Sequence, residues 1–467
     1  MTSTWVFYLL ILLLILSVFV TFKINYGVNK NLPPGNMGWI FVGQTRECLM
    51  NIHGFVQKRH NKYGKLFKTH IFGCPTVICA DLEVSRSLLL SDVSRGLVPG
   101  HPKSFMDLMG KWNIIAVQHD LHRRMRGAVL SFINGDTLKG RILAQIDDFV
   151  RLNLSDLGGK IVHMHEKCRD MAFYFWARKV ICLKKESEIE DLKKDYFELA
   201  DGLYRVPLDL PFSRYRKSLQ ARKRIVVKLG EKVRERRKLP LDFHDDLLAE
   251  VLRGEINGNV KTKLSDEQIL DFLVGTIFAG YDTTANTMMM TIKLLHDFPK
   301  ALQDLRLEHQ GIISRKSSSE ERLSWEDYKS MHFTQKIIQE TIRAANVVPA
   351  TIRKATKDIE IQGYMIPKGW KMLLCLTETN AKTNSSENSA VFDPWKMKNG
   401  NLMAFGGGSR MCPGKDLAML EMCVFLHHFL TRYQWEEIES NISFIVFPGI
   451  QTSKVMRIRL SDHVDNV

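Results

Sequence analysis

The distribution of apolar positions divides the chain into one long apolar run, a short β-rich stretch and a largely helical remainder. Residues 1–22 carry no charge, and about 20 apolar residues in a helix span a bilayer core of roughly 30 Å. Residues 64–80 alternate β-branched and aromatic residues around Gly73 and Pro75, which predicts a hairpin. Beyond residue 85 the apolar spacing is mostly helical. The pattern therefore predicts a mainly α protein with a small β part.

The longest predicted helix covers residues 266–297. Ser265 and Gln268 have the spacing of a capping box, and Pro299 predicts the end of the helix. The middle of this stretch is apolar nearly all round, which is typical of a helix buried in a large protein. Further predicted elements are helices around 139–153 and 219–237 and a second β stretch at 358–375.

The N-terminal apolar run is predicted to be a retained transmembrane helix. A cleaved signal peptide is the alternative, but it usually has a basic start, a shorter apolar stretch and a small-residue cleavage site. Lys23 and Lys30 follow the run and no charge precedes it, so the positive-inside rule places the rest of the chain in the cytosol. We expect an anchor at 1–22, a hinge with a proline-rich turn at 23–35, and one catalytic domain at 36–467.

Composition narrows the possible partners. The chain has 467 residues, of which 45% are hydrophobic and 25% charged, so it can build a large core. Its net charge of +15 suits nucleic acid, an anionic membrane surface or an acidic protein. Because zinc-finger spacing, RNP-like motifs and basic-aromatic stripes are missing from the sequence, we expect no nucleic-acid partner.

One of the eight cysteines has neighbours that indicate chemistry. The sequence holds no CxxC pair, and a cytosolic body would keep its thiols reduced. Cys412 lies in AFGGGSRMCPGKDLAMLE, residues 404–421, just before a helical run. Pro413 suits a first helical position. We therefore expect the thiol at a helix N-terminus, where unpaired N–H groups lower its pKa.

The surroundings of Cys412 suit a flat ligand with an acidic edge. Glycines at 406–408 let the backbone approach closely, and Gly414 keeps the first helical turn clear. Arg410 is placed to meet an anionic group on the same ligand. A planar metal macrocycle with acidic substituents meets all these requirements. The sequence thus predicts haem, with Cys412 as the axial thiolate ligand of its iron.

The loop also fits a known pattern, F-x-x-G-x-R-x-C-x-G, and so resembles the haem-binding loop of cytochrome P450 monooxygenases. The matching residues are Phe405, Gly408, Arg410, Cys412 and Gly414. The resemblance extends from about Leu32 to the end of the chain. It implies the cytochrome P450 fold, haem b as cofactor and oxygen insertion from O2.

A second motif interrupts the long buried helix at AGYDTT, residues 279–284. Splitting an O–O bond needs protons beside an otherwise apolar pocket. In the family an acid–alcohol pair supplies them, and by position these roles fall on Asp282 and Thr283. Ala279 and Gly280 would leave space for the oxygen. The alternative is that the threonine merely bonds back to the preceding helical turn.

A third motif, E-x-x-R, is formed by Glu340 and Arg343. At this spacing an acid and a base are commonly a solvated surface pair. The resemblance instead implies a buried pair, locked to a downstream basic residue, that supports the cysteine loop. Lys396 stands where the family usually has arginine, so the planar fork of a guanidinium is lost. The connection from Lys396 to Phe405 is also shorter than is usual in the family.

Basic residues for the acidic edge of the haem complete the predicted site. In DLHRRMRG, residues 120–127, His122 and Arg126 resemble the family's propionate-binding pair. Arg353 stands at the position of another usual propionate partner. A solvated surface is the alternative for any one of these residues, but together with Arg410 they form a consistent set.

Several stretches resemble one plant group in particular. LPPGNMGW, HIFGCPTVI and GYMIPKGW are similar to brassinosteroid C-6 oxidases, which convert a ring methylene of a hydroxylated sterol to a ketone, as from 6-deoxocastasterone to castasterone. GSRMCPGKDLAMLE also resembles ent-kaurenoic acid oxidases. AGYDTTAN and AANVVPATIR depart from the C-6 oxidases. A hydroxylase of another sterol, triterpenoid or diterpenoid therefore stays open.

Electrons and location follow from the same resemblance. No G-x-G-x-x-G follows a predicted strand, so NADPH electrons are expected from the separate NADPH–cytochrome P450 reductase, whose acidic surface suits a basic chain. We expect a single-pass protein of the endoplasmic reticulum membrane facing the cytosol. Two alternatives of other classes are a haem-thiolate isomerase or dehydratase, which often lacks the acid–alcohol pair, and a non-catalytic membrane-anchored haem protein.

Overall fold

The computed structural model describes residues 31–39, 43–240, 245–257, 264–318, 321–377, 392–397, 403–438, 444–445, 451–452 and 456–463. The predicted anchor at 1–22 lies outside the described residues, as does most of the hinge. Within the described ranges, no helix combines the length and the apolar character needed to cross a bilayer.

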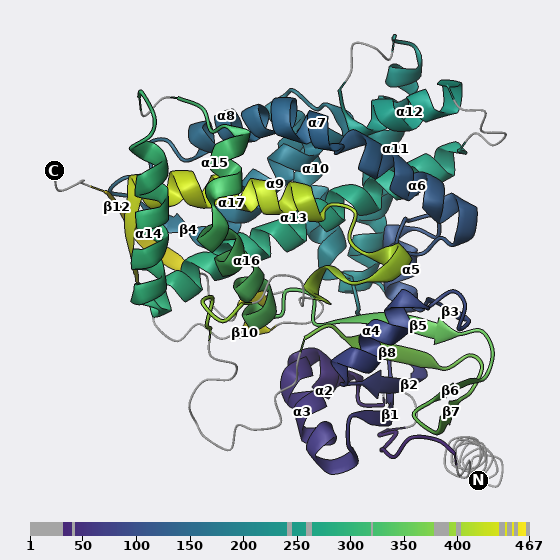
Figure 1. Ribbon diagram of the computed structural model, residues 1–467. Helices are drawn as coiled ribbons and strands as arrows, with labels where there is room; N and C mark the ends of the chain where they lie inside the picture. Colours follow the sequence, from purple (N-terminus) through teal and green to yellow (C-terminus); the bar gives the residue numbers. More distant parts are fainter. Residues whose placement is uncertain are drawn as a thin grey trace, which may run out of the picture. The chain divides into compact units, whose positions relative to one another are not determined.

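The chain folds into two compact units, each built from two separated stretches (Figure 1). The first unit comprises Met1–Gly100 and Ala350–Lys382, and the second comprises His101–Pro349 and Thr383–Val467. Residues 36–467 were predicted to form one domain, and apolar periodicity gives no sign that residues 350–382 return to the N-terminal stretch.

The first unit contains most of the β structure. Its five-stranded sheet has the order β1-β2-β8-β5-β3, in which only the β2–β8 pair is parallel. The predicted hairpin is confirmed, since β1 and β2 pair antiparallel around a turn in which Phe72 and Gly73 both have positive φ. The elements are α2 (Thr45–Met50), α3 (Ile52–Tyr63), β1 (Leu66–Ile71), β2 (Cys74–Cys79), α4 (Leu82–Leu90), β3 (Leu97–Pro99), β5 (Ala350–Ala355), β6 (Ile359–Ile361), β7 (Tyr364–Ile366) and β8 (Lys371–Cys375).

The second unit is helical apart from two small sheets, with the strand orders β4-β12-β9 and β10-β11. The predicted mainly α fold with a small β part is thereby confirmed. Its helices are α5 (Lys103–Met109), α6 (His119–Phe132), α7 (Gly135–Thr137), a π-helical turn (Leu138–Ile142), α8 (Leu143–Asn153), α9 (Met164–Ile181), α10 (Glu186–Asp201), α11 (Arg214–Arg237), α12 (Leu247–Asn257), α13 (Asp266–Asp297), α14 (Pro299–Ile313), α15 (Trp325–Ser330), α16 (His332–Ala345) and α17 (Lys415–Arg432). Its strands are β4 (Ile161–His163), β9 (Tyr433–Glu437), β10 (Phe444–Ile445), β11 (Gln451–Thr452) and β12 (Arg457–Asp462).

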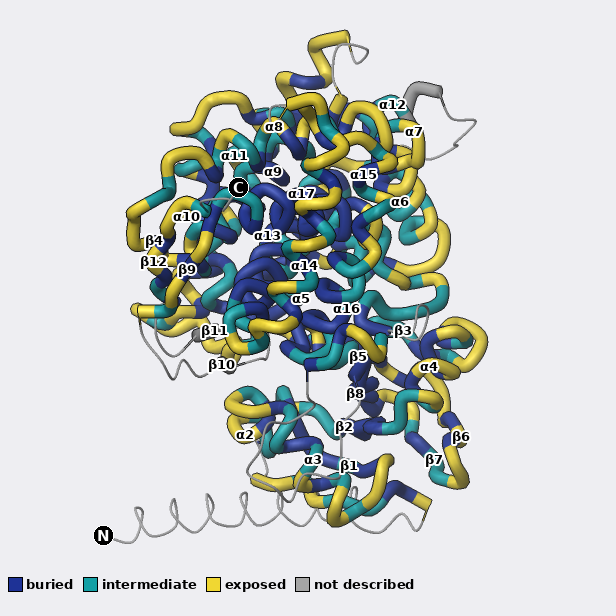
Figure 2. Tube along the Cα trace, turned by 60° about the vertical axis from the view of Figure 1, so that its left-hand side comes forward, coloured by how far each residue is buried: buried dark blue, intermediate teal, exposed yellow. Residues whose placement is uncertain are grey.

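Helix α13 runs through the core of the second unit, where Figure 2 shows it largely buried. Its predicted bounds are confirmed. Ser265 and Gln268 form a complete capping box, in which each side chain binds the other residue's backbone. Phe298 follows its last turn, and Pro299 then begins α14. Because α13 packs along α9, polar residues on it must find partners inside the protein.

Candidate active site

The cysteine loop is closed by one backbone hydrogen bond. Short 3₁₀ turns at Met403–Phe405 and Gly408–Arg410 bring the chain back on itself, so that the amide of Cys412 donates to the carbonyl of Phe405 at 2.8 Å. Gly406 and Gly408 have φ of 75° and 64°, in the left-handed region that favours glycine. The glycines predicted to allow close backbone approach thus also make the turn itself.

Helix α17 begins at Lys415, with Gly414 as its cap, so Pro413 precedes the helix instead of occupying its first position as predicted. The sulfur of Cys412 still lies at the helix N-terminus, because the backbone N–H groups of Gly414 and Lys415 donate to it. Burial nevertheless raises the pKa of the Cys412 thiol, and these donors and the charge of Arg126 only offset part of that effect. The expected lowering of the pKa is therefore wrong, since the sulfur loses more from desolvation than it gains from the helix.

Two of the predicted propionate-binding arginines meet at this loop. Arg410 donates to the carbonyl of Val117 at 2.6 Å and to that of Ile115 at 3.5 Å, just before α6 begins. From α6, Arg126 donates back to the carbonyl of Met411. His122 lies one helical turn before Arg126 and so shares its face of α6. The structure therefore brings Arg410, Arg126 and the Cys412 loop together.

Arg353 belongs to the first unit and has partners there. It is buried on β5, where it donates to the hydroxyl of Thr351 at 2.8 Å and pairs with the Asp92 carboxylate at 3.4 Å. Burial lowers the pKa of its guanidinium, against the opposing effect of Asp92. Its predicted role toward a propionate remains a prediction.

The residues of the second unit fit a thiolate-bound haem. A Cβ placed on Gly406 would meet no atom nearer than 3.8 Å, and one placed on Gly414 would lie 4.0 Å from the Cys412 sulfur, so the sulfur is not crowded by its own loop. A thiolate needs donors, which the Gly414 and Lys415 amides supply. A ligand with carboxylates needs cations, which Arg126 and Arg410 supply.

On α13, Asp282 and Thr283 are both partly exposed, as are Phe278 and Ala279 one turn before them. The hydroxyl of Thr283 donates to the carbonyl of Ala279 at 2.7 Å, which is the back-bond named as the alternative reading of this threonine. Its oxygen keeps the capacity to accept a further hydrogen bond. Burial raises the pKa of Asp282, while the charge of Arg169 acts in the opposite direction. Their catalytic roles remain predictions.

Gly280 has a packing role that the motif did not reveal. A Cβ at this position would lie 2.2 Å from ring atoms of Trp176 on α9. The indole therefore occupies the space freed by the missing side chain, which allows α9 and α13 to approach closely. Room for oxygen beside Gly280 remains a prediction, and Ala279, whose carbonyl accepts from Thr283, is the other residue to which it applies.

The E-x-x-R pair is formed on α16 and is buried at its acidic end. Arg343 binds Glu340 through two hydrogen bonds of 2.7 and 2.6 Å, and Glu340 is 2% exposed. The third donor to Glu340 is the backbone amide of Asp393, at 2.8 Å. Lys396 does not complete this lock, contrary to the expectation, because its side chain is 87% exposed and pairs with the Asp393 carboxylate. Residues 398–402 of the short connection lie outside the described part of the chain.

Sequence reasoning missed three residues around these motifs. Trp176 was not singled out, although a glycine inside a helix signals close approach of another element. Asn286 lies one turn beyond Asp282 and binds it at 3.3 Å, a neighbour that spacing alone would have suggested. The Asp393 amide could not have been found in the sequence, because every residue except proline has a backbone N–H and the residue type does not show which one binds.

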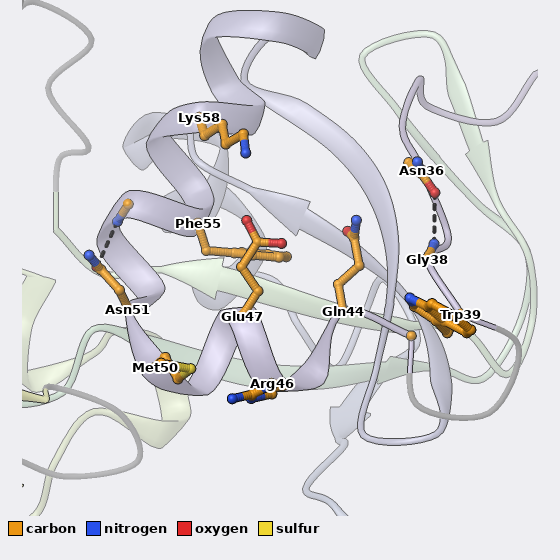
Figure 3. A pocket seen from close by; sticks show the side chains of 12 residues that line it. Asn36, Gly38, Trp39, Gln44, Arg46, Glu47, Met50, Asn51, Phe55 and Lys58 are labelled. Atoms are coloured by element: carbon orange, nitrogen blue, oxygen red, sulfur yellow. Dashed lines mark hydrogen bonds between the residues drawn. The ribbon is translucent and has the colours of Figure 1, made fainter.

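A separate hollow of about 1300 Å³ lies in the first unit, beside α2 and α3 (Figure 3). Its lining residues fall between Asn36 and Lys58, so they include none of the predicted haem-binding residues. Trp39, at its edge in Figure 3, and Met50 are both strongly exposed. Its lining contains no cysteine, so it cannot supply the thiolate that the sequence predicts as the ligand of the haem iron.

Comparison with known proteins agrees with this geometry. A family model described as Cytochrome P450 matches residues 33–448. "Cytochrome P450 85A1" of Brachypodium distachyon is 39% identical over 447 residues, covering 94% of this chain and 95% of the relative. The protein of the same name from Arabidopsis thaliana is 40% identical and covers 93% of each. "Cytochrome P450 720B2" of Pinus taeda is 30% identical over 99% of this chain and 98% of its own length.

A solved structure supports the fold. The retinoic acid bound cyanobacterial CYP120A1 superposes with a TM-score of 0.81 at 24% identity, covering 92% of this chain and 99% of that one. At this identity the likeness concerns the fold alone. The predicted family resemblance and fold are confirmed by these matches.

Proposed function

This chain belongs to the cytochrome P450 family and is a haem-dependent monooxygenase, and we propose that it oxidises C-6 of a brassinosteroid precursor of the 6-deoxocastasterone type. The stretches LPPGNMGW, HIFGCPTVI and GYMIPKGW, which resemble brassinosteroid C-6 oxidases, and the plant relatives of the 85A group support this substrate class. The single observation that carries the chemistry is the Cys412 loop, with two amides donating to its sulfur.

Haem bound through Cys412 supplies the redox chemistry that activates O2 and inserts one oxygen atom into a C–H bond. Each round consumes one O2, two electrons and two protons, and releases one water. Two rounds at C-6 give a geminal diol, which loses water to leave the ketone.

Residues of this chain bind the haem, support the cysteine loop and deliver protons. Arg126, Arg410 and His122 hold the acidic edge of the haem, and the amides of Gly414 and Lys415 stabilise the negative charge on the sulfur. Glu340 and Arg343 brace the segment that leads into the cysteine loop through the Asp393 amide. From α13, Asp282 and Thr283 take up and pass the protons that the reaction consumes.

Electrons reach the haem from a redox partner, as in the family. That partner is NADPH–cytochrome P450 reductase in this proposal, because a net charge of +15 suits an acidic docking surface. Residues 1–22 anchor the chain in the endoplasmic reticulum membrane with the catalytic part facing the cytosol. A hydrophobic substrate then enters from the membrane side.

A second candidate is a hydroxylase of another sterol, triterpenoid or diterpenoid. AGYDTTAN and AANVVPATIR, which depart from the C-6 oxidases, favour it.

The experiment has two stages and uses the full chain in membranes. The ferrous carbon monoxide complex should show the red-shifted Soret band of a thiolate haem. Cys412→Ala should abolish it, whereas Cys423→Ala, a buried cysteine of α17, should retain it. With reductase and NADPH, 6-deoxocastasterone should then give the C-6 ketone. A thiolate band without this product would refute the C-6 proposal. Binding spectra across sterol and terpenoid libraries would then test the second candidate. Loss of the band in both cysteine variants would leave the ligand assignment without support.

A further inference from the structure

Two further side chains, Asn286 and His165, are linked by hydrogen bonds to Asp282, the acid of the predicted acid–alcohol pair. Asn286 follows Asp282 by one turn of α13, and its Nδ2 donates to Oδ2 of Asp282 at 3.3 Å. On its other side, Oδ1 of Asn286 lies 3.0 Å from Nε2 of His165, which comes from α9. Asn286 is 2% exposed. A buried amide with a partner on each side has one favoured orientation.

The direction of each hydrogen bond follows from the chemistry of the groups. An ionised carboxylate only accepts hydrogen bonds, so the NH2 group of Asn286 must face Asp282. Its carbonyl oxygen then faces His165, and Nε2 of His165 must carry the proton. Burial lowers the pKa of His165 to about 4, so the ring is neutral at neutral pH. His165 is thus fixed as a neutral Nε2–H donor.

The same face of α9 also carries a positive charge toward Asp282. Arg169 lies one turn after His165, and its guanidinium stacks over the Phe197 ring at 3.8 Å. Its charge opposes the rise that burial causes in the pKa of Asp282. The carboxyl of Asp282 therefore faces the charge of Arg169 from α9 and the oriented amide of Asn286 from its own helix. These two groups favour one rotamer and the ionised form of the carboxyl, whereas burial favours its neutral form.

We propose that Asn286 and His165 are positioning residues for Asp282: His165 orients the Asn286 amide, which holds Oδ2 of Asp282. The other oxygen, Oδ1, then takes up and releases the proton. This inference rests on the proposed proton-delivery role of Asp282. It also accounts for the asparagine in AGYDTTAN, one of the stretches that depart from the C-6 oxidases.

The first test measures coupling, the share of NADPH electrons recovered in hydroxylated product, in the reconstituted full-length enzyme. Asn286→Leu keeps the number and branching of the heavy atoms but removes both hydrogen bonds, and should lower coupling about tenfold, with hydrogen peroxide formed instead. Thr287→Val is the matched control, because Thr287 is equally buried and its hydroxyl donates to the Thr283 backbone carbonyl. It should stay within about twofold of the wild type. His165→Gln, which keeps a donor, should couple better than His165→Phe.

A double variant separates this inference from the proposed function. If Asn286 acts through Asp282, adding Asn286→Leu to Asp282→Asn should cause no further loss of coupling. A full additional loss would overturn the positioning role. Normal coupling in Asp282→Asn alone would overturn the proton role of Asp282 and this inference with it. Loss in Asp282→Asn but none in Asn286→Leu would overturn only the positioning role.

A second readout does not depend on turnover. In protein labelled with ¹⁵N-histidine and held in the diamagnetic ferrous carbon monoxide form, long-range ¹H–¹⁵N spectra report the tautomer of each ring. His165, assigned by the signal lost in His165→Gln, should carry its proton on Nε2 and stay neutral down to about pH 5.5. In Asn286→Leu that tautomer preference should disappear. A wild-type His165 protonated on Nδ1, or titrating at its ordinary value, would overturn the hydrogen-bond chain.

Discussion

The indole of Trp176 occupies the space that a side chain on Gly280 would need, with ring atoms 2.2 Å from the position of a Cβ. This contact sets how closely α9 approaches α13. Asp282 and Asn286 lie within about two turns of Gly280 on α13, and their partner His165 lies about three turns before Trp176 on α9. The glycine therefore belongs to the support of the predicted proton-delivery residues.

Gly280→Ala should destabilise the protein because the new methyl group overpacks the contact between α9 and α13. A cost of about 1–3 kcal/mol is typical of such changes. Urea denaturation followed by far-UV circular dichroism measures it. Gly311→Ala in α14 is the control, since a Cβ there meets nothing within 4 Å, and it should leave stability unchanged or slightly raised. Equal effects of the two variants would mean that the Trp176 contact does not matter.

Glu340→Gln should reduce haem retention more than it changes secondary structure. The substitution leaves Arg343 without its carboxylate and weakens the bond from the Asp393 amide. Because the remaining Arg343 is only partly buried, we expect a cost below the roughly 3–5 kcal/mol that breaking a fully buried pair causes. The ratio of haem to protein after gel filtration is the measurement. Lys396→Gln should leave that ratio unchanged because its side chain is exposed. If Lys396→Gln lost haem and Glu340→Gln did not, Lys396 would support the cysteine loop, as the family pattern implies.

Acid should destabilise the protein through two buried histidines. His309 and His427 face each other with their Nδ1 atoms 3.2 Å apart, and burial lowers the pKa of His309 to about 3 and that of His427 as well. The unfolded chain binds more protons than the folded one below about pH 6.5, so stability is full above that pH and falls as the pH drops. The slope approaches about 1.4 kcal/mol per pH unit for each histidine.

Denaturation midpoints between about pH 7.5 and 5 measure this slope. His427→Leu should flatten it, whereas His332→Gln, an exposed histidine at the start of α16, should leave it unchanged. A flat wild-type profile would contradict the burial of neutral imidazoles.

Gly275→Ala should weaken substrate binding. A Cβ at Gly275 would lie 1.7 Å from Nδ2 of Asn113, so the variant must displace that buried side chain. Asn113 accepts from the Ile115 amide, and the carbonyls of Ile115 and Val117 accept from Arg410. We expect a loss of about 1 kcal/mol, roughly fivefold in Kd, in the titration of the type I spectral shift. An unchanged Kd would show that this segment does not shape the pocket.

Much of the local structure was readable from the sequence. The capping box of Ser265 and Gln268, the hairpin around Gly73 and the loop before α17 are each encoded within a few neighbouring residues. Such signals act through local hydrogen bonds and backbone preferences, which need no knowledge of the rest of the chain. The same holds for the pattern that identified the family, because its residues span ten positions of one loop.

Only the tertiary structure decided which distant groups meet. Gly280 faces Trp176, the Asp393 amide binds Glu340 in place of Lys396, and Arg353 pairs with Asp92. These pairs join residues separated by tens to hundreds of positions, so no periodicity records them. The direction in which the pKa of Cys412 shifts was also decided by the tertiary structure, since it depends on how far burial outweighs the helix donors. The sequence alone predicted the main elements and proposed the iron ligand, and packing determined the partners, because burial and close contact are properties of the folded chain.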